Sequence, residues 1–347
     1  MSTLFSSLPI VSLSALSSAE RNEGQLRVLS SRLDEVFSTI GFAYLTDLPL
    51  TYTHEDVFGL CDSFFGDNGV TNEEKMQVAK KMFVRGNKNT YRGYFPVQLG
   101  ADNLKEGFEL GAPTTRSALS HSPLLSERVN LTEPNVFPTS NPSFRHRCES
   151  LHTELQSLCA KLLSLLAVGL GKPTTFFDHY LEDSLSTLRL LHYPPVPEPR
   201  RHAIICTPHT DSGILTLLHQ DTTGGLEVQN SAGQWIPAPY VPGSVVVNIG
   251  DLMAKVSGGR WIATNHRVRS VGRDEGVVTR GRYSVPFFFE PGINCVVKSV
   301  QGDEVIYGEH LLEKMKGWVE FQDLEEETSD THPVDITRGI KLPLLLS

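Results

Sequence analysis

The sequence has no excess of basic residues and no long apolar run. Its 347 residues include 31 Lys and Arg against 40 Asp and Glu, which gives a formal net charge of -9. Proteins that bind nucleic acid or an anionic membrane through charge carry the opposite balance, so neither is expected as a partner. No run of about 18 apolar residues, the length of a membrane-spanning helix, is present. A small molecule is the expected partner.

Cysteine is scarce as well. The five cysteines are scattered without any C-x-x-C spacing, which argues against a disulfide framework and against a zinc ribbon. The first residues show no basic segment before their short apolar run, so no secretory signal peptide is predicted. The glycosylation sequon at Asn130 is therefore expected to be silent. We expect reduced thiols and a cytoplasmic location.

The amino-terminal half has the periodicity of helices. Apolar residues recur at spacings of three and four over residues 23–40 and again in a leucine stripe over 144–169, which is expected in the core. A capping-box pattern opens a predicted helix over 71–83, with the Glu74 side chain bonded back to the cap. Residues 89–110 show no clear pattern and are expected to be irregular.

The carboxy-terminal half changes in texture. From residue 188 to 297, short runs of β-branched and aromatic residues alternate with Pro and Gly turns, which is typical of a sandwich or jelly roll. A last helix is predicted over 309–319. Because no repeats or low-complexity tracts are present, a single domain is favoured.

Within this β-rich half, His209 and Asp211 lie two residues apart at the start of an apolar run. Side chains at i and i+2 of a strand share a face, so an imidazole nitrogen and a carboxylate oxygen can point at one spot. These are two of the three ligands of a facial Fe(II) site. A chain with 12 histidines can contain this spacing by chance, and His54 and Asp56 repeat it. That second copy is predicted in a helix, where residues two apart point in different directions.

A third ligand and an anion-binding pair follow further along the chain. His266 can supply the remaining imidazole. Arg282 and Ser284 share one face of a predicted strand and offer a guanidinium fork and a hydroxyl, which suit a carboxylate. Taken alone, Arg282 is more simply a surface ion-pair residue.

Four segments in this order resemble the Fe(II)- and 2-oxoglutarate-dependent oxygenases of the isopenicillin N synthase-like type. They are residues 207–218, 242–251, 262–268 and 282–284. The likeness extends to amino-terminal segments at 8–11, 41–44, 92–94, 105–108 and 135–138. It therefore covers nearly the whole chain.

The resemblance implies an α+β fold with a double-stranded β-helix (jelly roll) core flanked by helices. A single oxygenase domain is expected over 1–347. Within it, 1–186 form a mainly helical amino-terminal part, 187–300 the jelly-roll catalytic core, and 301–347 a carboxy-terminal helix and tail.

The resemblance also implies a chemistry and its residues. The Fe(II) ligands are His209, Asp211 and His266. The 2-oxoglutarate contacts are Arg282, Ser284 and Tyr193. With O2 as oxidant, such an enzyme oxidises an unactivated C-H bond of a small molecule by hydroxylation, desaturation or ring rearrangement, and secondary metabolism is the expected setting. Asn248 is expected to be structural.

Alternatives remain at this point. An oxidase of the isopenicillin N synthase type shares the fold without using 2-oxoglutarate, and succinate formation separates the two. A binding protein that has lost turnover is a rival from another class, against which the intact metal set counts. The spacing from His266 to Arg282 predicts a long hairpin over 271–281 and leaves Arg280 as a competitor for the carboxylate. Leu191 replaces a polar residue often found two before the tyrosine.

Substrate contacts are the least determined. By strand alternation Phe288 shares the inward face with Arg282, so we expect it to line the substrate side of the iron, with ordinary core filling as the alternative. Residues 71–92 are expected to roof the site. Arg92 is a candidate substrate contact, although basic residues in such segments are usually solvated.

Overall fold

Two sheets, antiparallel except for the parallel pair of β1 and β2, and a layer of helices make up the structure, a computed structural model. It describes residues 3–17, 22–97, 104–113, 130–195, 203–271 and 281–316. The main sheet has eight strands in the order β1-β2-β10-β7-β12-β5-β4-β3. The second sheet has four, β6-β11-β8-β9, and β13 and β14 form a small hairpin.

The strands come from both halves of the chain. The main sheet contains β1 (Ile10–Ser12), β2 (Phe42–Thr46), β3 (Gly93–Phe95), β4 (Glu106–Leu110), β5 (Thr187–Tyr193), β7 (Leu215–Gln220), β10 (Val245–Ile249) and β12 (Arg282–Phe289). The second sheet contains β6 (Ile204–His209), β8 (Leu226–Gln229), β9 (Trp235–Pro237) and β11 (His266–Arg269). The hairpin is β13 (Val296–Lys298) and β14 (Glu304–Ile306). The α+β jelly roll is therefore confirmed.

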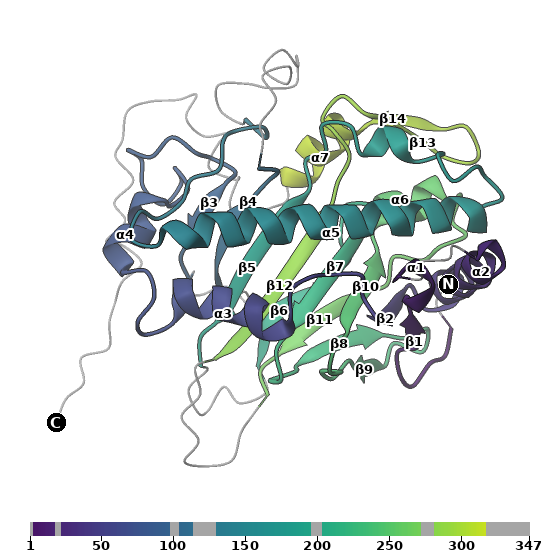
Figure 1. Ribbon diagram of the computed structural model, residues 1–347, viewed down its shortest axis with the longest axis horizontal. Coiled ribbons are helices and arrows are strands. Elements are labelled where there is room, and N and C mark those ends of the chain that lie inside the picture. The colour runs from purple at the N-terminus through teal and green to yellow at the C-terminus, as the bar shows by residue number, and fades with distance from the viewer. Residues whose placement is uncertain are drawn as a thin grey trace.

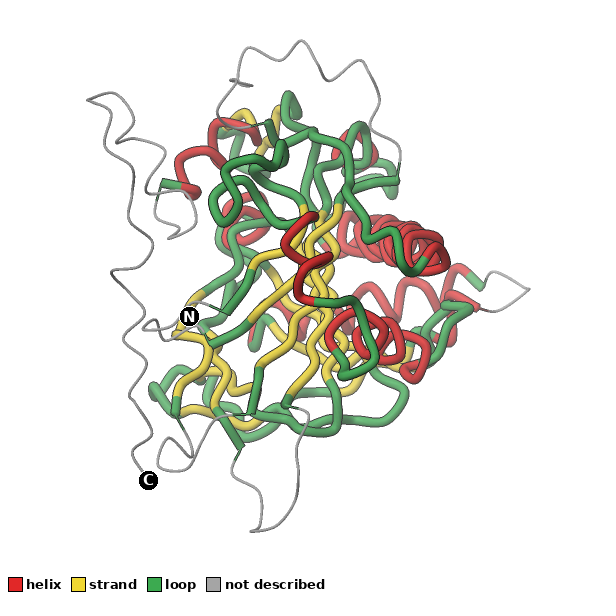
Figure 2. The backbone as a smooth tube through the Cα atoms, turned by 90° about the vertical axis from the view of Figure 1, so that its left-hand side faces the viewer, coloured by secondary structure: helices red, strands yellow, loops and turns green. Residues whose placement is uncertain are grey.

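Helices cover the face of the main sheet that lies away from the four-stranded sheet. The longest, α5 (Pro142–Gly169), runs across the strands, with α2 (Glu23–Thr39) and α3 (His54–Phe65) beside it (Figure 1). Figure 2, turned by 90°, shows most of the helical tube on one side of the strands. The predicted leucine stripe of α5 is buried, and the ring of His152 meets Phe287 of β12 edge-on with 5.1 Å between ring centres. This helical layer packs against the face of the main sheet that lies away from the four-stranded sheet.

The remaining helices are short. They are α1 (Ser14–Ser17), α4 (Asn72–Gln77), the 3-10 turn η2 (Asp178–Tyr180), α6 (Asp251–Val256) and α7 (Tyr307–Met315). The last of these confirms the predicted carboxy-terminal helix, although it begins two residues earlier, and residues beyond 316 lie outside the described part. No helix among the described residues is long and apolar enough to cross a membrane.

The helix predicted over 71–83 is shorter than expected. It ends at Gln77 because Ala79 forms a parallel bridge with Tyr94 and the amide of Lys80 donates to the carbonyl of Tyr94. The Glu74 amide does donate to the Thr71 cap, yet its side chain accepts from the amides of residues 139 and 140 instead of closing the box. Pairing with a distant segment outweighs the local helix pattern.

The segment expected to be irregular, 89–110, contains β3 and β4. These strands extend the main sheet beyond β5, so the part before residue 187 supplies four of its eight strands and is less helical than expected. β4 carries Glu106 and Glu109 with Gly107 between them, so it lacks the apolar alternation that marks a half-buried strand. Lys75 of α4 pairs with Glu106, and Lys80, which follows that helix, pairs with Glu109, so each carboxylate has a cationic partner.

Candidate metal centre and cosubstrate site

The second sheet brings two distant histidines together. His209 is the last residue of β6 and His266 the first of β11, and these strands pair with the two residues opposite each other. Their ring centres lie 4.3 Å apart. Asp211 follows β6 after one residue, so the turn that leaves this strand carries its carboxylate back toward the imidazoles.

The three side chains present converging ligand atoms. Oδ1 of Asp211 lies 3.8 Å from Nε2 of His209 and 3.7 Å from Nε2 of His266. One ligand atom from each residue falls within 4.8 Å of the others, a spacing suited to one ion. Two imidazoles and one carboxylate on one side are the donor set of a non-haem Fe(II) site.

Backbone carbonyls fix which nitrogen of each ring faces the ion. Nδ1 of His209 lies 2.8 Å from the carbonyl oxygen of Thr207, and Nδ1 of His266 lies 3.2 Å from that of Thr264. A carbonyl only accepts, so each Nδ1 donates and each Nε2 keeps its lone pair for a metal. Outer partners of this kind orient metal ligands and set their basicity.

The carboxylate of Asp211 is held from the main sheet. Its Oδ2 accepts the hydroxyl of Thr216 at 2.6 Å and the side-chain amide of Asn248 at 2.8 Å, which leaves Oδ1 toward the histidines. Burial disfavours ionisation of Asp211, but the neighbouring histidines and these two donors outweigh it and lower the pKa of the carboxyl. Asn248 therefore has the structural role expected of it. The sequence did not single out Thr216.

Arg282 lies on the same inner face, with guanidinium donors that have no partner in the part of the chain that the structure describes. It is 3% exposed, and its Nε donates to the carbonyl of Gly224 at 2.8 Å. Its Nη1 and Nη2 have no hydrogen-bond partner among the described residues. Ser284 lies two residues on, and Tyr193 stands opposite Arg282 in the register, with the guanidinium carbon 5.0 Å from the ring centre. A buried fork with free donors fits a carboxylate.

The structure describes only part of the two predicted departures from the family pattern. Arg280 and most of the expected hairpin over 271–281 lie outside the described residues. Leu191 is buried on β5 directly opposite Ser284. The structure therefore places an apolar side chain beside the hydroxyl expected to bind 2-oxoglutarate.

Strand β12 alternates as expected. Phe287 is fully buried and faces α5. Phe288 pairs with Thr216 on one side and with Thr187 on the other, so it lies on the inner face, and it is the one residue of β12 that keeps partial exposure.

Arg92 is a buried residue whose guanidinium has partners within the protein. It is 3% exposed, and its guanidinium donates to the Thr187 hydroxyl at 2.6 Å and to the Leu185 carbonyl at 3.1 Å. These bonds favour a structural role for Arg92 in supporting the start of β5. Contact with substrate stays a prediction.

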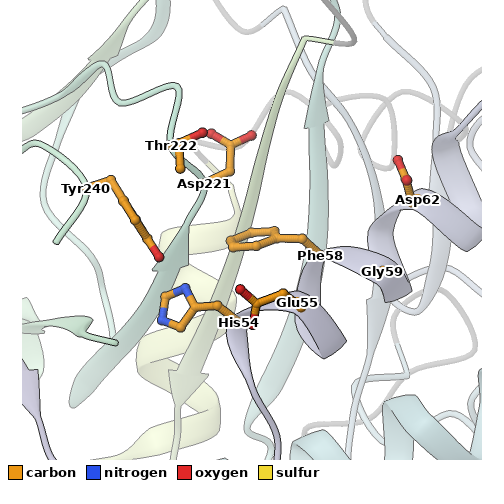
Figure 3. Close-up of a pocket in the computed structure, with 8 residues that line it drawn as sticks. All are labelled: His54, Glu55, Phe58, Gly59, Asp62, Asp221, Thr222 and Tyr240. Atoms are coloured by element: carbon orange, nitrogen blue, oxygen red, sulfur yellow. The ribbon is translucent and has the colours of Figure 1, made fainter. Parts of the chain in front are cut away.

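The second copy of the H-x-D pattern lies elsewhere. Asp56 caps α3 by accepting from the amide and hydroxyl of Thr53. His54 instead lines a cavity of about 360 Å³ together with Phe58 and Tyr240 (Figure 3). The two side chains thus lie in different surroundings, which agrees with the expectation that they do not chelate one ion.

Known proteins share both the sequence pattern and the architecture. The profile of the 2OG-Fe(II) oxygenase superfamily matches residues 184–291. The 2-oxoglutarate-dependent dioxygenase frbJ of a Dothideomycetidae species is 32% identical over 87% of this chain and 79% of its own length. The dioxygenase citB of Monascus ruber is 33% identical over 65% of this chain and 72% of its own length. The chain belongs to the 2OG-Fe(II) oxygenase superfamily.

A solved structure agrees with this assignment. A full-length Neurospora crassa protein, crystallised in complex with alpha-KG, superposes with a TM-score of 0.72 at 27% identity, covering 89% of this chain and 96% of that one. This 2OG-Fe(II) oxygenase is thus an Fe(II)- and 2-oxoglutarate-dependent dioxygenase with O2 as oxidant. The alternative of an oxidase that does not use 2-oxoglutarate is not favoured, and the isopenicillin N synthase-like subgroup stays a prediction.

Proposed function

We propose that this dioxygenase oxidises an unactivated C-H bond of a small molecule, with Fe(II) held by His209, Asp211 and His266. Arg282, Ser284 and Tyr193 bind 2-oxoglutarate. The observation that carries the proposal is the Arg282 guanidinium, which is buried on the inner face of β12 with two nitrogens unpartnered among the described residues. An unpaired buried charge is costly, so an anion is expected there.

The residues have separable tasks in this proposal. The bound iron and 2-oxoglutarate supply the activation of O2. Three protein ligands on one side leave coordination positions for cosubstrate and oxygen. Thr216 and Asn248 keep Asp211 oriented, while Arg282 and Ser284 fix the far end of the cosubstrate. The protein's own contribution is positioning and the exclusion of water.

The setting remains part of the proposal. Relatives among fungal 2-oxoglutarate-dependent dioxygenases support a role in secondary metabolism. The proposal also includes two predictions made from the sequence, the cytoplasmic location and the division of a single domain at residues 187 and 300. Hydroxylation, desaturation and ring rearrangement are all open to this site.

The test measures iron and succinate together. Purified protein should bind one Fe(II) and form succinate from 2-oxoglutarate when oxygen is consumed. His209→Ala and His266→Ala should each lose bound iron and turnover, whereas His54→Ala, a matched histidine outside the triad, should keep both. Full iron content and turnover in both triad variants would refute the metal assignment. Oxygen uptake without succinate would restore the oxidase alternative.

A further inference from the structure

Glu290 is a buried carboxyl that neither the iron site nor the cosubstrate site uses. It directly follows the last residue of β12, and an antiparallel bridge between Ser184 and Gly292 continues the pairing of this strand with the segment before β5. Side chains two residues apart in an extended chain share a face. Glu290 therefore continues the inner face on which Phe288 lies.

The same carboxyl lies beside the metal-binding turn. A Cβ built on Gly213 would lie 3.5 Å from Cγ of Glu290 and 3.9 Å from its Oε1. Gly213 is two residues beyond the metal ligand Asp211. A substrate held against Phe288 near the iron can therefore reach this carboxyl.

The hydrogen-bonding capacity of Glu290 is not used within the described part of the chain. The residue is 5% exposed, and its Oε2 has no hydrogen-bond partner there. Burial raises the pKa of Glu290, and the nearby hydroxyl of Tyr307, the first residue of α7, opposes this rise. That hydroxyl is also without a hydrogen-bond partner among the described residues, and Tyr307 is 1% exposed. Buried polar groups are nearly always hydrogen-bonded, so a further polar group is expected beside these two.

The charges around Glu290 favour a neutral group. The charged neighbours are Arg92, whose guanidinium donates to a hydroxyl and a carbonyl, and the ion pair of Arg189 with Glu109. Arg92 would repel a cationic ligand, and the ionised form of Glu290 would repel an anionic one. Burial raises the pKa of Glu290 to about 7, so at neutral pH it is about half protonated. The protonated carboxyl presents a hydroxyl donor beside a carbonyl acceptor.

We propose that Glu290 binds a cis-amide of the substrate, an N–H beside a C=O as in a lactam or imide, while the ring that carries this amide packs against Phe288. The inference rests on the proposed function and names its substrate class. A carboxyl group pairs with a cis-amide through two parallel hydrogen bonds, one donated and one accepted. Phe288 pairs with Thr216, which holds the metal ligand Asp211. Glu290 lies about 7 Å further along the chain, so the amide and the oxidised carbon are several bonds apart.

The test uses the holoenzyme with Fe(II) and saturating 2-oxoglutarate, without oxygen. Isoindolinone, phthalimide and 2-quinolone are added, each beside its N-methyl derivative, which keeps the ring and the carbonyl but cannot donate a hydrogen bond. Benzoate and benzylammonium serve as charged comparisons. A ligand that binds the folded state raises the melting temperature by an amount set by its affinity. At least one N–H compound should bind about tenfold more tightly than its N-methyl derivative.

Two substitutions at Glu290 and one control connect this preference to the residue. Glu290→Leu removes the donor and the acceptor and should abolish the preference for the N–H compound. Glu290→Gln keeps one of each and should retain most of the preference. The fold should tolerate Glu290→Leu because Oε2 has no partner among the described residues that the change would leave unpaired. The control is Glu304→Leu, at an exposed carboxylate of β14 that pairs with Lys298, and it should leave the preference intact.

The outcomes separate this inference from the proposed function. If no N–H compound exceeds its N-methyl derivative, the inference is overturned even when succinate is formed with oxygen present. A preference that persists in Glu290→Leu would mean that the N-methyl group is excluded by shape alone, which also overturns it, as would tighter binding of benzoate or benzylammonium than of every amide. A preference that depends on Glu290 in a protein that forms no succinate would keep the inference and refute the proposed function.

Discussion

The hydroxyl of Thr216 donates to Oδ2 of Asp211 at 2.6 Å, which joins a residue of strand β7 to the carboxylate in the metal-binding turn before it. Because Asn248 occupies the same oxygen, Oδ1 alone is presented to the two histidines. The main sheet therefore sets the orientation of a ligand whose two companions belong to the other sheet.

Removal of this hydroxyl should weaken iron binding without removing a ligand. Thr216→Val keeps the shape of the side chain but leaves Asp211 with one donor, and loss of such outer partners typically costs about ten- to a hundredfold in metal affinity. Anaerobic Fe(II) titration measures the change. Thr216→Ser retains the hydroxyl and should bind iron nearly as well as the wild type. Equal affinity in all three proteins would show that Asn248 alone orients the carboxylate.

Arg282→Leu should raise the KM for 2-oxoglutarate. A charge-assisted hydrogen bond is worth roughly 1.5 to 3 kcal/mol, which corresponds to about ten- to a hundredfold at about 1.4 kcal/mol per decade. Ser284→Ala removes a neutral donor and should cost less. Steady-state succinate assays at varied 2-oxoglutarate measure both. An unchanged KM in Arg282→Leu together with a large rise in Arg280→Leu would transfer the role to Arg280.

Much of this site could be predicted from sequence because it follows from strand alternation. His209 with Asp211, and Arg282 with Ser284, are each two residues apart, so a local pattern places both members of a pair on one face. Arg282 and Ser284 both lie on β12, whereas β6 ends at His209 and Asp211 lies in the turn that follows, so alternation accounts for the second pair and the turn for the first. Thr216 escaped notice because a threonine in a β-rich run is common, and only its contact with Asp211 distinguishes it.

The features that the sequence did not predict depend on distant pairings. The helix that follows residue 71 ends early because Ala79 forms a bridge with Tyr94. The local helix pattern contains no information about this distant partner. Likewise, Glu109 sits in a strand without apolar alternation because Lys80 and Arg189 neutralise it from two other segments. Local propensity is a weak guide wherever tertiary contacts supply the stabilisation.

Phe288→Ala should separate cosubstrate turnover from product formation. The partial exposure of Phe288 predicts a small stability loss, whereas a core Phe→Ala change typically costs about 3 to 5 kcal/mol. Without the Phe288 ring the substrate is held loosely beside the iron, and a displacement of the substrate by about 1 Å can cost roughly a hundredfold in rate. Succinate should still form, with less product per succinate.

The neighbouring residue provides the matched control for that change. Phe287 is fully buried against His152, so Phe287→Ala should lower the melting temperature strongly. If Phe288→Ala lost as much stability while product per succinate stayed constant, Phe288 would be core filling.

Glu290 should make the stability of the protein fall as pH rises from about 4.5 to about 7. Burial raises the pKa of this carboxyl from 4.5 to about 7 in the folded protein. Between these values the folded state holds a proton that the unfolded state has lost, so each step up in pH favours unfolding, and the loss is complete above pH 7. At about 1.4 kcal/mol per pKa unit the full effect is roughly 3 kcal/mol.

Glu290→Gln removes this titration while keeping a carbonyl oxygen beside the Tyr307 hydroxyl. The variant should match the wild type near pH 4.5 and exceed it in melting temperature at pH 8, with the difference growing through the interval between. Glu304→Gln, at an exposed carboxylate paired with Lys298, serves as the control and should show no such growth. A difference between Glu290→Gln and wild type that stays constant from pH 4.5 to 8 would mean that Glu290 is ionised throughout.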